Sequence, residues 1–221
     1  MSSVSKAKKT AVERRHAQRR GEHGAKRKAQ KADGMGPNHS PKPLDDLKLE
    51  VRCDSANTLE ILGPLVVCRW SVPLGLAAAL VAAGREVPVP VVGHMLVDTG
   101  ASSTCIAADV AQELGLLSHG TGVTFGAHGP GTVQKYVAHF DMRIKDSVRG
   151  EVTVARDLIA SAVPDLNGAY QQAQPKASDG RPVRLIGLLG RDFLRHTTLT
   201  YEGAEGRLHL RIHLKSLTKL N

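Results

Sequence analysis

The stretch Met95-Leu96-Val97-Asp98-Thr99-Gly100-Ala101-Ser102 decides the fold of this chain. Its three apolar residues, preceded by Val91 and Val92, run directly into a carboxylate, a hydroxyl and a glycine. Asp and Gly are both poor strand residues, so a strand that ends on them is unusual. Placing Asp98 beside so much apolar surface is costly unless hydrogen bonds or a shared proton compensate for the lost water. The pattern therefore indicates a chemical role for Asp98.

A second motif, Leu185-Ile186-Gly187-Leu188-Leu189-Gly190-Arg191-Asp192-Phe193-Leu194, is an apolar run followed by Gly-Arg-Asp and the start of a short helix. The pair LVDTGAS and LLGRDFL resembles the retropepsin-like aspartic proteases, the retroviral type and its cellular and bacterial relatives. The resemblance covers about residues 63–214 and keeps the family's order of motifs. It implies a mainly β, single-domain closed β-barrel, the acid protease fold, with one or two short helices.

The resemblance also assigns roles to the residues of the first motif. Asp98 supplies half of a water-activating dyad, and Thr99 bonds across to the partner's loop. Gly100 lets its backbone approach the carboxylate and the substrate without a side chain. Ala101 and Ser102 line the cleft and offer backbone groups to an extended peptide.

In the second motif, Gly190, Arg191 and Asp192 are expected to support the active loop, with Gly190 in close packing behind it. Retroviral enzymes place a second Asp four residues after the catalytic one and pair it with the Arg of this element. Ser102 stands at that position here, so Arg191 needs another partner.

A glycine-rich loop, Gly126-Ala127-His128-Gly129-Pro130-Gly131, separates two strand-like stretches at residues 123–125 and 132–144. The family keeps its flap, the hairpin that closes over bound peptide, at this position. The alternative is an ordinary surface hairpin. The flap interpretation makes four residues substrate-binding: Gly126, Ala127, His128 and Gly129.

Two carboxylates that share one proton can activate water and protonate the leaving amide, so peptide hydrolysis needs no metal or cofactor. The sequence holds a single Asp-Thr-Gly, so the second carboxylate comes from another copy across a two-fold axis. We therefore expect a homodimeric aspartic endopeptidase acting on peptides or proteins. The alternative is a non-catalytic dimeric peptide-binding module on the same fold.

The net charge of +9 belongs to one end of the chain, since residues 1–43 hold 12 Lys and Arg against 3 Asp and Glu. These residues contain no aromatic and few large aliphatic side chains, which predicts a disordered basic tail before a domain at residues 44–221. The tail is a solubilising extension or a site of weak, non-specific nucleic-acid contact. In the second case the protein acts chiefly through its tail.

Three cysteines without CxxC spacing argue against a disulfide scaffold or zinc site and favour a reducing, cytoplasmic location. The longest apolar stretch, residues 72–83, falls short of the ~18 residues of a membrane span, so we expect no membrane partner. Residues 74–83 predict a short helix. Residues 161–182, rich in Gly, Pro and Gln, predict an insertion over the site or a disordered surface loop.

Overall fold

The computed structural model describes residues 46–52, 56–126, 129–146, 149–168, 176 and 182–217. The predicted tail at residues 1–43 lies outside these ranges, as do Ala127, His128 and most of residues 169–181. The strands are β1 Asp46–Arg52, β2 Leu65–Ser71, β3 Val91–Val97, β4 Cys105–Ala107, β5 Ser118–Gly126, β6 Gly129–Asp146, β7 Gly150–Val163, β8 Leu185–Leu189, β9 Thr197–Glu202 and β10 Arg207–His213. The helices are α2 Ala56–Leu62, α3 Leu74–Ala82, α4 Ala108–Glu113, α6 Arg191–Leu194, the 3₁₀ turn η1 Gly203–Glu205 and α7 Leu214–Leu217.

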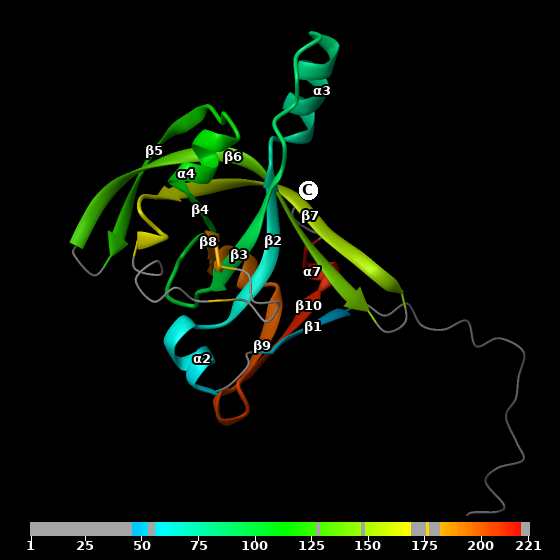
Figure 1. The fold of residues 1–221 in the computed structure, drawn as a ribbon, viewed down its shortest axis with the longest axis vertical. Coiled ribbons are helices and arrows are strands. Elements are labelled where there is room, and N and C mark those ends of the chain that lie inside the picture. The colour runs from blue at the N-terminus through cyan, green and yellow to red at the C-terminus, as the bar shows by residue number, and fades with distance from the viewer. Residues whose placement is uncertain are drawn as a thin grey trace, which may run out of the picture. The chain divides into compact units, whose positions relative to one another are not determined.

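Six strands close into a barrel in the order β2-β3-β8-β4-β7-β6, because β6 returns to pair with β2 (Figure 1). The closing pairs are Arg69↔Asp141, Trp70↔Phe140 and Ser71↔His139. The Arg69 Nε donates to Asp141 Oδ2 at 2.6 Å, which pairs a carboxylate that is only 2% exposed. Closure pairs residues 69–71 of β2, which would otherwise belong to a free edge of the sheet. The mainly β, closed-barrel prediction is confirmed.

The core of the barrel is built around three aromatic rings in edge-to-face contact. Trp70 and Phe140 have ring centroids 5.4 Å apart, and Phe140 and Phe193 are 5.7 Å apart. All three side chains are buried, and the Trp70 Nε1 donates to the carbonyl of Ile186 at 3.1 Å. Phe193 belongs to α6, so the short helix after β8 is anchored in the same core as the barrel strands.

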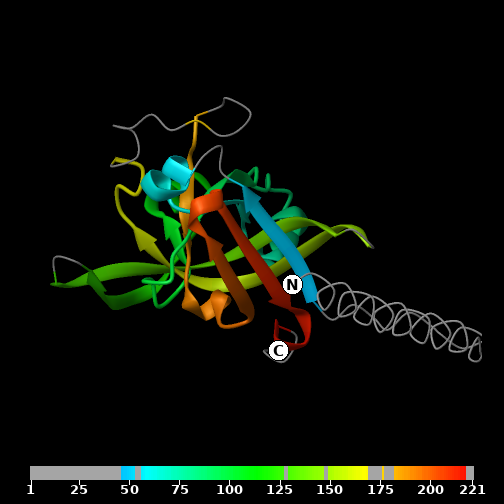
Figure 2. The same cartoon turned by 90° about the horizontal axis from the view of Figure 1, so that it is seen from below.

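A smaller antiparallel sheet, β1-β10-β9, lies beside the barrel (Figure 2). Alternation along these strands buries Leu208, Leu210 and Ile212 of β10 against the core, as the period-2 pattern predicts. Leu47 and Val51 of β1 pair with Ile212 and Leu208 and are buried as well. The outward side chains of β10 are polar or charged.

Two elements differ from the sequence prediction. Helix α2 was not predicted, although Ser55 stands directly before it and Gly63-Pro64 directly after it, because its seven residues are too few to show a clear apolar period. Strand β7 runs to Val163, so the first residues of the predicted 161–182 insertion are strand. Residues 161–163 pair with β4 in parallel, and such a long-range pairing leaves no local signal. The helix predicted at residues 74–83 is confirmed as α3.

The C-terminal helix is tied to the core through His196, which is 4% exposed. Its Nδ1 lies 2.6 Å from the Ser216 hydroxyl of α7, and its Nε2 has no hydrogen-bond partner among the described residues. Burial lowers the pKa of His196 below its usual range, and the neighbouring Arg195 and Arg156 lower it further. The folded protein therefore favours the neutral imidazole.

We predict that His196 makes folding less stable as the pH falls. The unfolded chain binds a proton near the ordinary histidine pKa of about 6.5, whereas the folded chain resists it, so stability is lost as the pH falls below about 6.5. The advantage of the wild type over His196→Gln in free energy of unfolding should shrink between about pH 7 and pH 5. Urea unfolding at each pH measures it, and a growing advantage at low pH would contradict the sign.

Candidate active site

Asp98 follows the last residue of β3 and is held at the end of the barrel by its own backbone. Along β3, Val91, Met95 and Val97 are buried, and Asp98 comes next at half burial. The Asp98 amide donates to the carbonyl of Leu189 in β8 at 3.1 Å. The parallel β3–β8 pairing thus places Asp98 beside Leu189, directly before the Gly190-Arg191-Asp192 part of the second motif.

The loop after β3 folds back on the Asp98 carboxylate. The Gly100 amide donates to Asp98 Oδ1 at 2.8 Å, and the Ala101 amide donates to the Asp98 carbonyl at 3.3 Å. A Cβ on Gly100 would lie 3.0 Å from Oδ1, tighter than most real contacts of that kind. Glycine therefore allows this close approach of backbone and carboxylate. Thr99, Gly100 and Ser102 are exposed, and Ala101 is half-buried.

Arg191 holds the same loop by its carbonyl oxygens. Its Nη1 donates to the carbonyls of Thr99 at 2.8 Å and Gly100 at 3.1 Å, and its backbone amide donates to the Ala101 carbonyl at 2.9 Å. The partner that Arg191 needs in place of an acid at position 102 is therefore the backbone of the Asp98 loop. A guanidinium suits this role because it presents several donors in a fixed plane.

Asp192 holds the next part of the loop through Thr104. Its Oδ1 accepts from the Thr104 amide and hydroxyl, both at 2.7 Å, and from the Phe193 amide at 2.8 Å. The Thr104 hydroxyl in turn accepts from the Gly190 amide at 3.2 Å. Three donors on one oxygen satisfy this carboxylate in a structural position.

Thr104 is the site residue that sequence reasoning missed. It is fully buried, one of few buried polar side chains among the described residues, and its hydroxyl both donates and accepts. Its position between the serines of the loop and the apolar Cys105-Ile106-Ala107 strand gave no signal beyond an ordinary strand residue. Only the three-dimensional pairing with Asp192 identifies its role.

Gly190 allows the second motif to pass directly behind the loop. A Cβ there would lie 2.3 Å from the carbonyl carbon and 2.4 Å from the oxygen of Ser103, and 2.7 Å from the Thr104 nitrogen. These atoms are backbone and cannot rotate away. The second motif therefore passes too close to the loop backbone for any side chain at position 190.

The Cys105 thiol lies next to this network and stays protonated. Burial raises its pKa to about 11, and the negative charges of Asp192 and Asp98 raise it as well. Its Sγ donates to the Ser103 carbonyl at 3.3 Å. Cys105 therefore behaves as a small buried side chain that adds no charge beside Asp98.

The glycine-rich tip belongs to a different part of the chain. Strands β5 and β6 pair in antiparallel fashion up to Gly126↔Gly129, and the hairpin end projects away from the barrel (Figure 1). Gly129 has φ +97°, a conformation that suits glycine. Ala127 and His128 lie outside the described residues, so their predicted contact with substrate stays a prediction.

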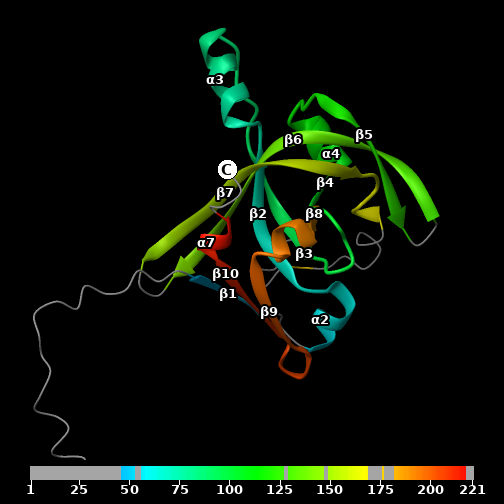
Figure 3. The same ribbon diagram turned by 180° about the vertical axis from the view of Figure 1, so that it is seen from behind.

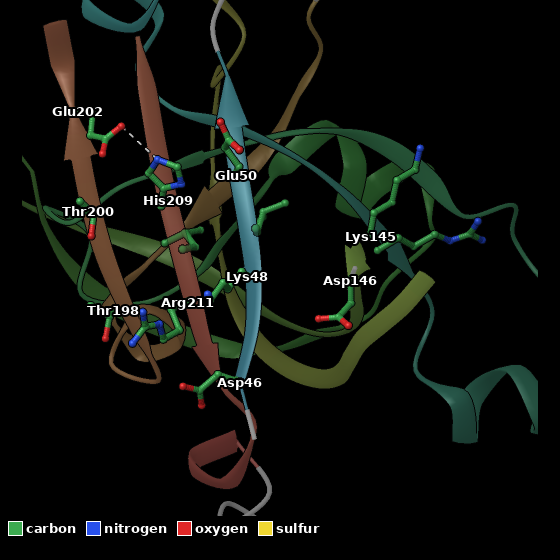
Figure 4. Close-up of a pocket in the computed structure, with 13 residues that line it drawn as sticks. Asp46, Lys48, Glu50, Lys145, Asp146, Thr198, Thr200, Glu202, His209 and Arg211 are labelled. Atoms are coloured by element: carbon green, nitrogen blue, oxygen red, sulfur yellow. Dashed lines mark hydrogen bonds and ion pairs between the residues drawn. The ribbon is translucent and has the colours of Figure 1, made fainter. Parts of the chain in front are cut away.

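A polar hollow of about 900 Å³ lies over the outer side of β1-β10-β9, away from the Asp98 loop (Figure 4). Its walls carry both signs of charge, with Lys48 and Arg211 toward Asp46 and with Glu202 beside His209. His209 Nε2 lies 3.2 Å from Glu202, and the neighbouring His213 Nδ1 lies 3.1 Å from Asp46. Within the described ranges no group of three His, Cys, Asp or Glu side chains is placed to hold a metal ion.

Comparison with known proteins gives one family. Residues 84–193 match a protein-family model described as aspartyl protease. The matched range contains both the Asp98 loop and the Gly190-Arg191-Asp192 element that holds it. No curated protein matches the chain.

We predict that Gly190→Ala destabilises the protein by roughly 1–3 kcal/mol, because the new methyl group meets backbone atoms of Ser103 and Thr104. Gly75→Ala in α3 is the matched control, since a Cβ there meets nothing within 4 Å. Urea unfolding of both variants measures the difference. Equal stability of the two would show that the loop can move away from β8 without cost.

Proposed function

The chain belongs to the retropepsin-like aspartyl protease family, and from that premise we propose that it is an aspartic endopeptidase whose dyad is formed by Asp98 of two protomers. The family match supports protease function in general. The observation that carries the finer proposal is the single Asp98 carboxylate at the end of β3, oriented by the Gly100 amide and half open to solvent. Such a group can accept a proton from water when it shares one proton with a second carboxylate.

The second carboxylate is expected from another copy of the chain. The sequence has one Asp-Thr-Gly, and Asp192, the acid nearest along the supporting element, is committed to Thr104 and Phe193. A two-fold axis beside the loop would bring two Asp98 side chains together. Thr99 is exposed and so available for the bond to the partner's loop.

Substrate would bind as an extended strand beside Ala101 and Ser102. The Ala101 carbonyl already accepts from the Arg191 amide, which leaves Ser102, exposed on the same loop, with the freer backbone. The hairpin tip from Gly126 to Gly129 would close over the peptide as a flap and exclude water during hydrolysis.

The proposed setting follows from the same residues. The described cysteines, Cys68 and Cys105, are buried and free of disulfides, which fits a reducing, cytoplasmic location. Burial raises the pKa of Cys68 above its ordinary value, so this thiol also stays protonated. The proposed partners are a second copy of the chain and a peptide or protein substrate.

We predict that Asp98→Asn abolishes peptide cleavage and preserves the fold, since the amide oxygen can still accept from Gly100. The variant should also poison the wild type. After subunit exchange in an equal mixture, about a quarter of the dimers carry two Asp98 carboxylates. Activity should therefore fall to about a quarter of that of the wild type alone at the same total protein concentration.

Activity of about one half would mean that each protomer is self-sufficient. Undiminished cleavage by pure Asp98→Asn would contradict the proposed role of Asp98, and peptide binding without cleavage by the wild type would leave a peptide-binding module as the better description. Light scattering of each sample confirms that the dimer content is the same.

We further predict that Gly129→Val lowers the rate of peptide cleavage, because a branched side chain at φ +97° stiffens or distorts the tip. Gly150→Val is the matched control: Gly150 has φ +78° and open space around it, and it begins β7 opposite Asp146, the last residue of β6. Both variants should lose similar thermal stability, and only Gly129→Val should lose turnover. Equal turnover would make the β5–β6 hairpin ordinary surface.

A further inference from the structure

Helix α3 is apolar and contributes no buried residue to the fold. It has the sequence LGLAAALVA, and Leu74, Leu76 and Val81 are 65%, 37% and 66% exposed. Helices that are apolar all round are ordinarily buried in a core or a membrane. An exposed one costs solubility, and within α3 only the half-buried Ala77 packs against the core. Its surface therefore requires an explanation outside the fold.

The exposed apolar surface covers more than one face of the helix. At 100° per residue, half-buried Ala77 and Leu80 define one side, and the exposed residues occupy the remaining arc of roughly 220°. Leu74 lies near one edge of this arc and Leu76 near the other. A second helix packs against a stripe of about 100°. One protein partner, including a second α3, would therefore leave much of this surface in water.

The helix stands away from the barrel and away from the candidate active site. It connects the end of β2 to the start of β3, and both Figure 1 and Figure 3 show it projecting from that end. Asp98 follows the opposite end of β3. The paired strands run from Leu65↔Leu96 to Trp70↔Val91, a separation of roughly 20 Å. A surface that binds α3 would leave the Asp98 loop accessible.

The surroundings of α3 in the sequence fit a lipid surface. Residues 71–84 carry no charged side chain, and the pair Arg85-Glu86 follows directly. Nine helical residues rise about 13–14 Å, close to the half-thickness of a ~30 Å hydrocarbon core. None of the helices in the described residues has the length and apolar content needed to cross a bilayer. Contact with one leaflet is therefore the relevant case.

The charge of the chain adds a second signal of matching sign. Residues 1–43 carry 12 Lys and Arg against 3 Asp and Glu, a composition attracted to anionic lipid headgroups. A single apolar anchor gives only marginal binding, and a polybasic segment in the same chain makes attachment stable. We propose that α3 inserts into the interface of an anionic bilayer, to which the basic composition of residues 1–43 adds electrostatic attraction.

This proposal changes the expectation from the sequence, which gave no membrane partner. Residues 72–83 are too short to span, and a short apolar helix read from sequence is normally a core element. Because α3 is exposed, it is not a core element. It is still too short to span a bilayer. Peripheral attachment through one leaflet is consistent with both. It is independent of whether the Asp98 site cleaves peptides.

The test is flotation of the full-length protein with vesicles of phosphatidylcholine and phosphatidylserine at 7:3, and of phosphatidylcholine alone. We expect the protein to bind the anionic vesicles and to bind the neutral vesicles more weakly. Added NaCl should weaken its binding to the anionic vesicles. Leu74→Gln and Leu76→Gln should each lower the partition coefficient by about tenfold, because lipid contacts both edges of the arc. Ile61→Gln, at a residue 72% exposed elsewhere on the surface, is the control and should change nothing.

Each variant should keep the wild-type melting temperature, since neither leucine is buried. Three results would overturn the proposal: no flotation of the wild type, equal binding to both kinds of vesicle, or unchanged binding by both leucine variants. An effect of one leucine alone, with a fall in oligomer mass by light scattering, would also overturn it in favour of a second copy of the chain.

Discussion

The Asp98 loop keeps its shape because α6 binds its backbone. Arg191 donates to the carbonyls of Thr99, Gly100 and Ala101, and Asp192 accepts from Thr104. These bonds use loop carbonyls and an amide, so they do not depend on an acidic side chain at position 102. A loop that carries a half-open carboxylate would otherwise expose several polar backbone groups at the end of an apolar strand. The Gly-Arg-Asp element is thus the condition for a fixed Asp98.

This support works only because the barrel brings β8 and β4 very close together. A Cβ on Gly187 would lie 2.2 Å from the Cys105 carbonyl oxygen, and one on Gly190 would meet Ser103. Two glycines in one short motif therefore set the distance between the loop and its support. Phe193 then fixes α6 in the aromatic core with Phe140. Closure of the barrel, packing of its core and geometry of the site form one connected arrangement.

The sequence was informative where a motif joins local structure to chemistry. The strand ending on Asp98 was predicted from residues adjacent in the chain, and the closed barrel and the close packing at Gly190 were implied by the resemblance of the two motifs to a known family. Thr104, the carbonyl partners of Arg191 and the extension of β7 to Val163 were not, because each depends on contact between distant segments. The exposure of α3 was also beyond sequence reasoning, since an apolar period reports a helix and not what covers it.

The two ends of the β2–β3 pair separate two kinds of surface. At one end β3 leads into the polar Asp98 loop, which is held by hydrogen bonds. At the other end β2 leads into the apolar helix α3, which has no buried residue. Residues so far apart with no shared partners contribute to stability nearly independently. Selection on the helix surface is therefore free of the constraints at the loop. This independence explains how one small barrel can carry an exposed apolar helix without disturbing the geometry of the Asp98 loop.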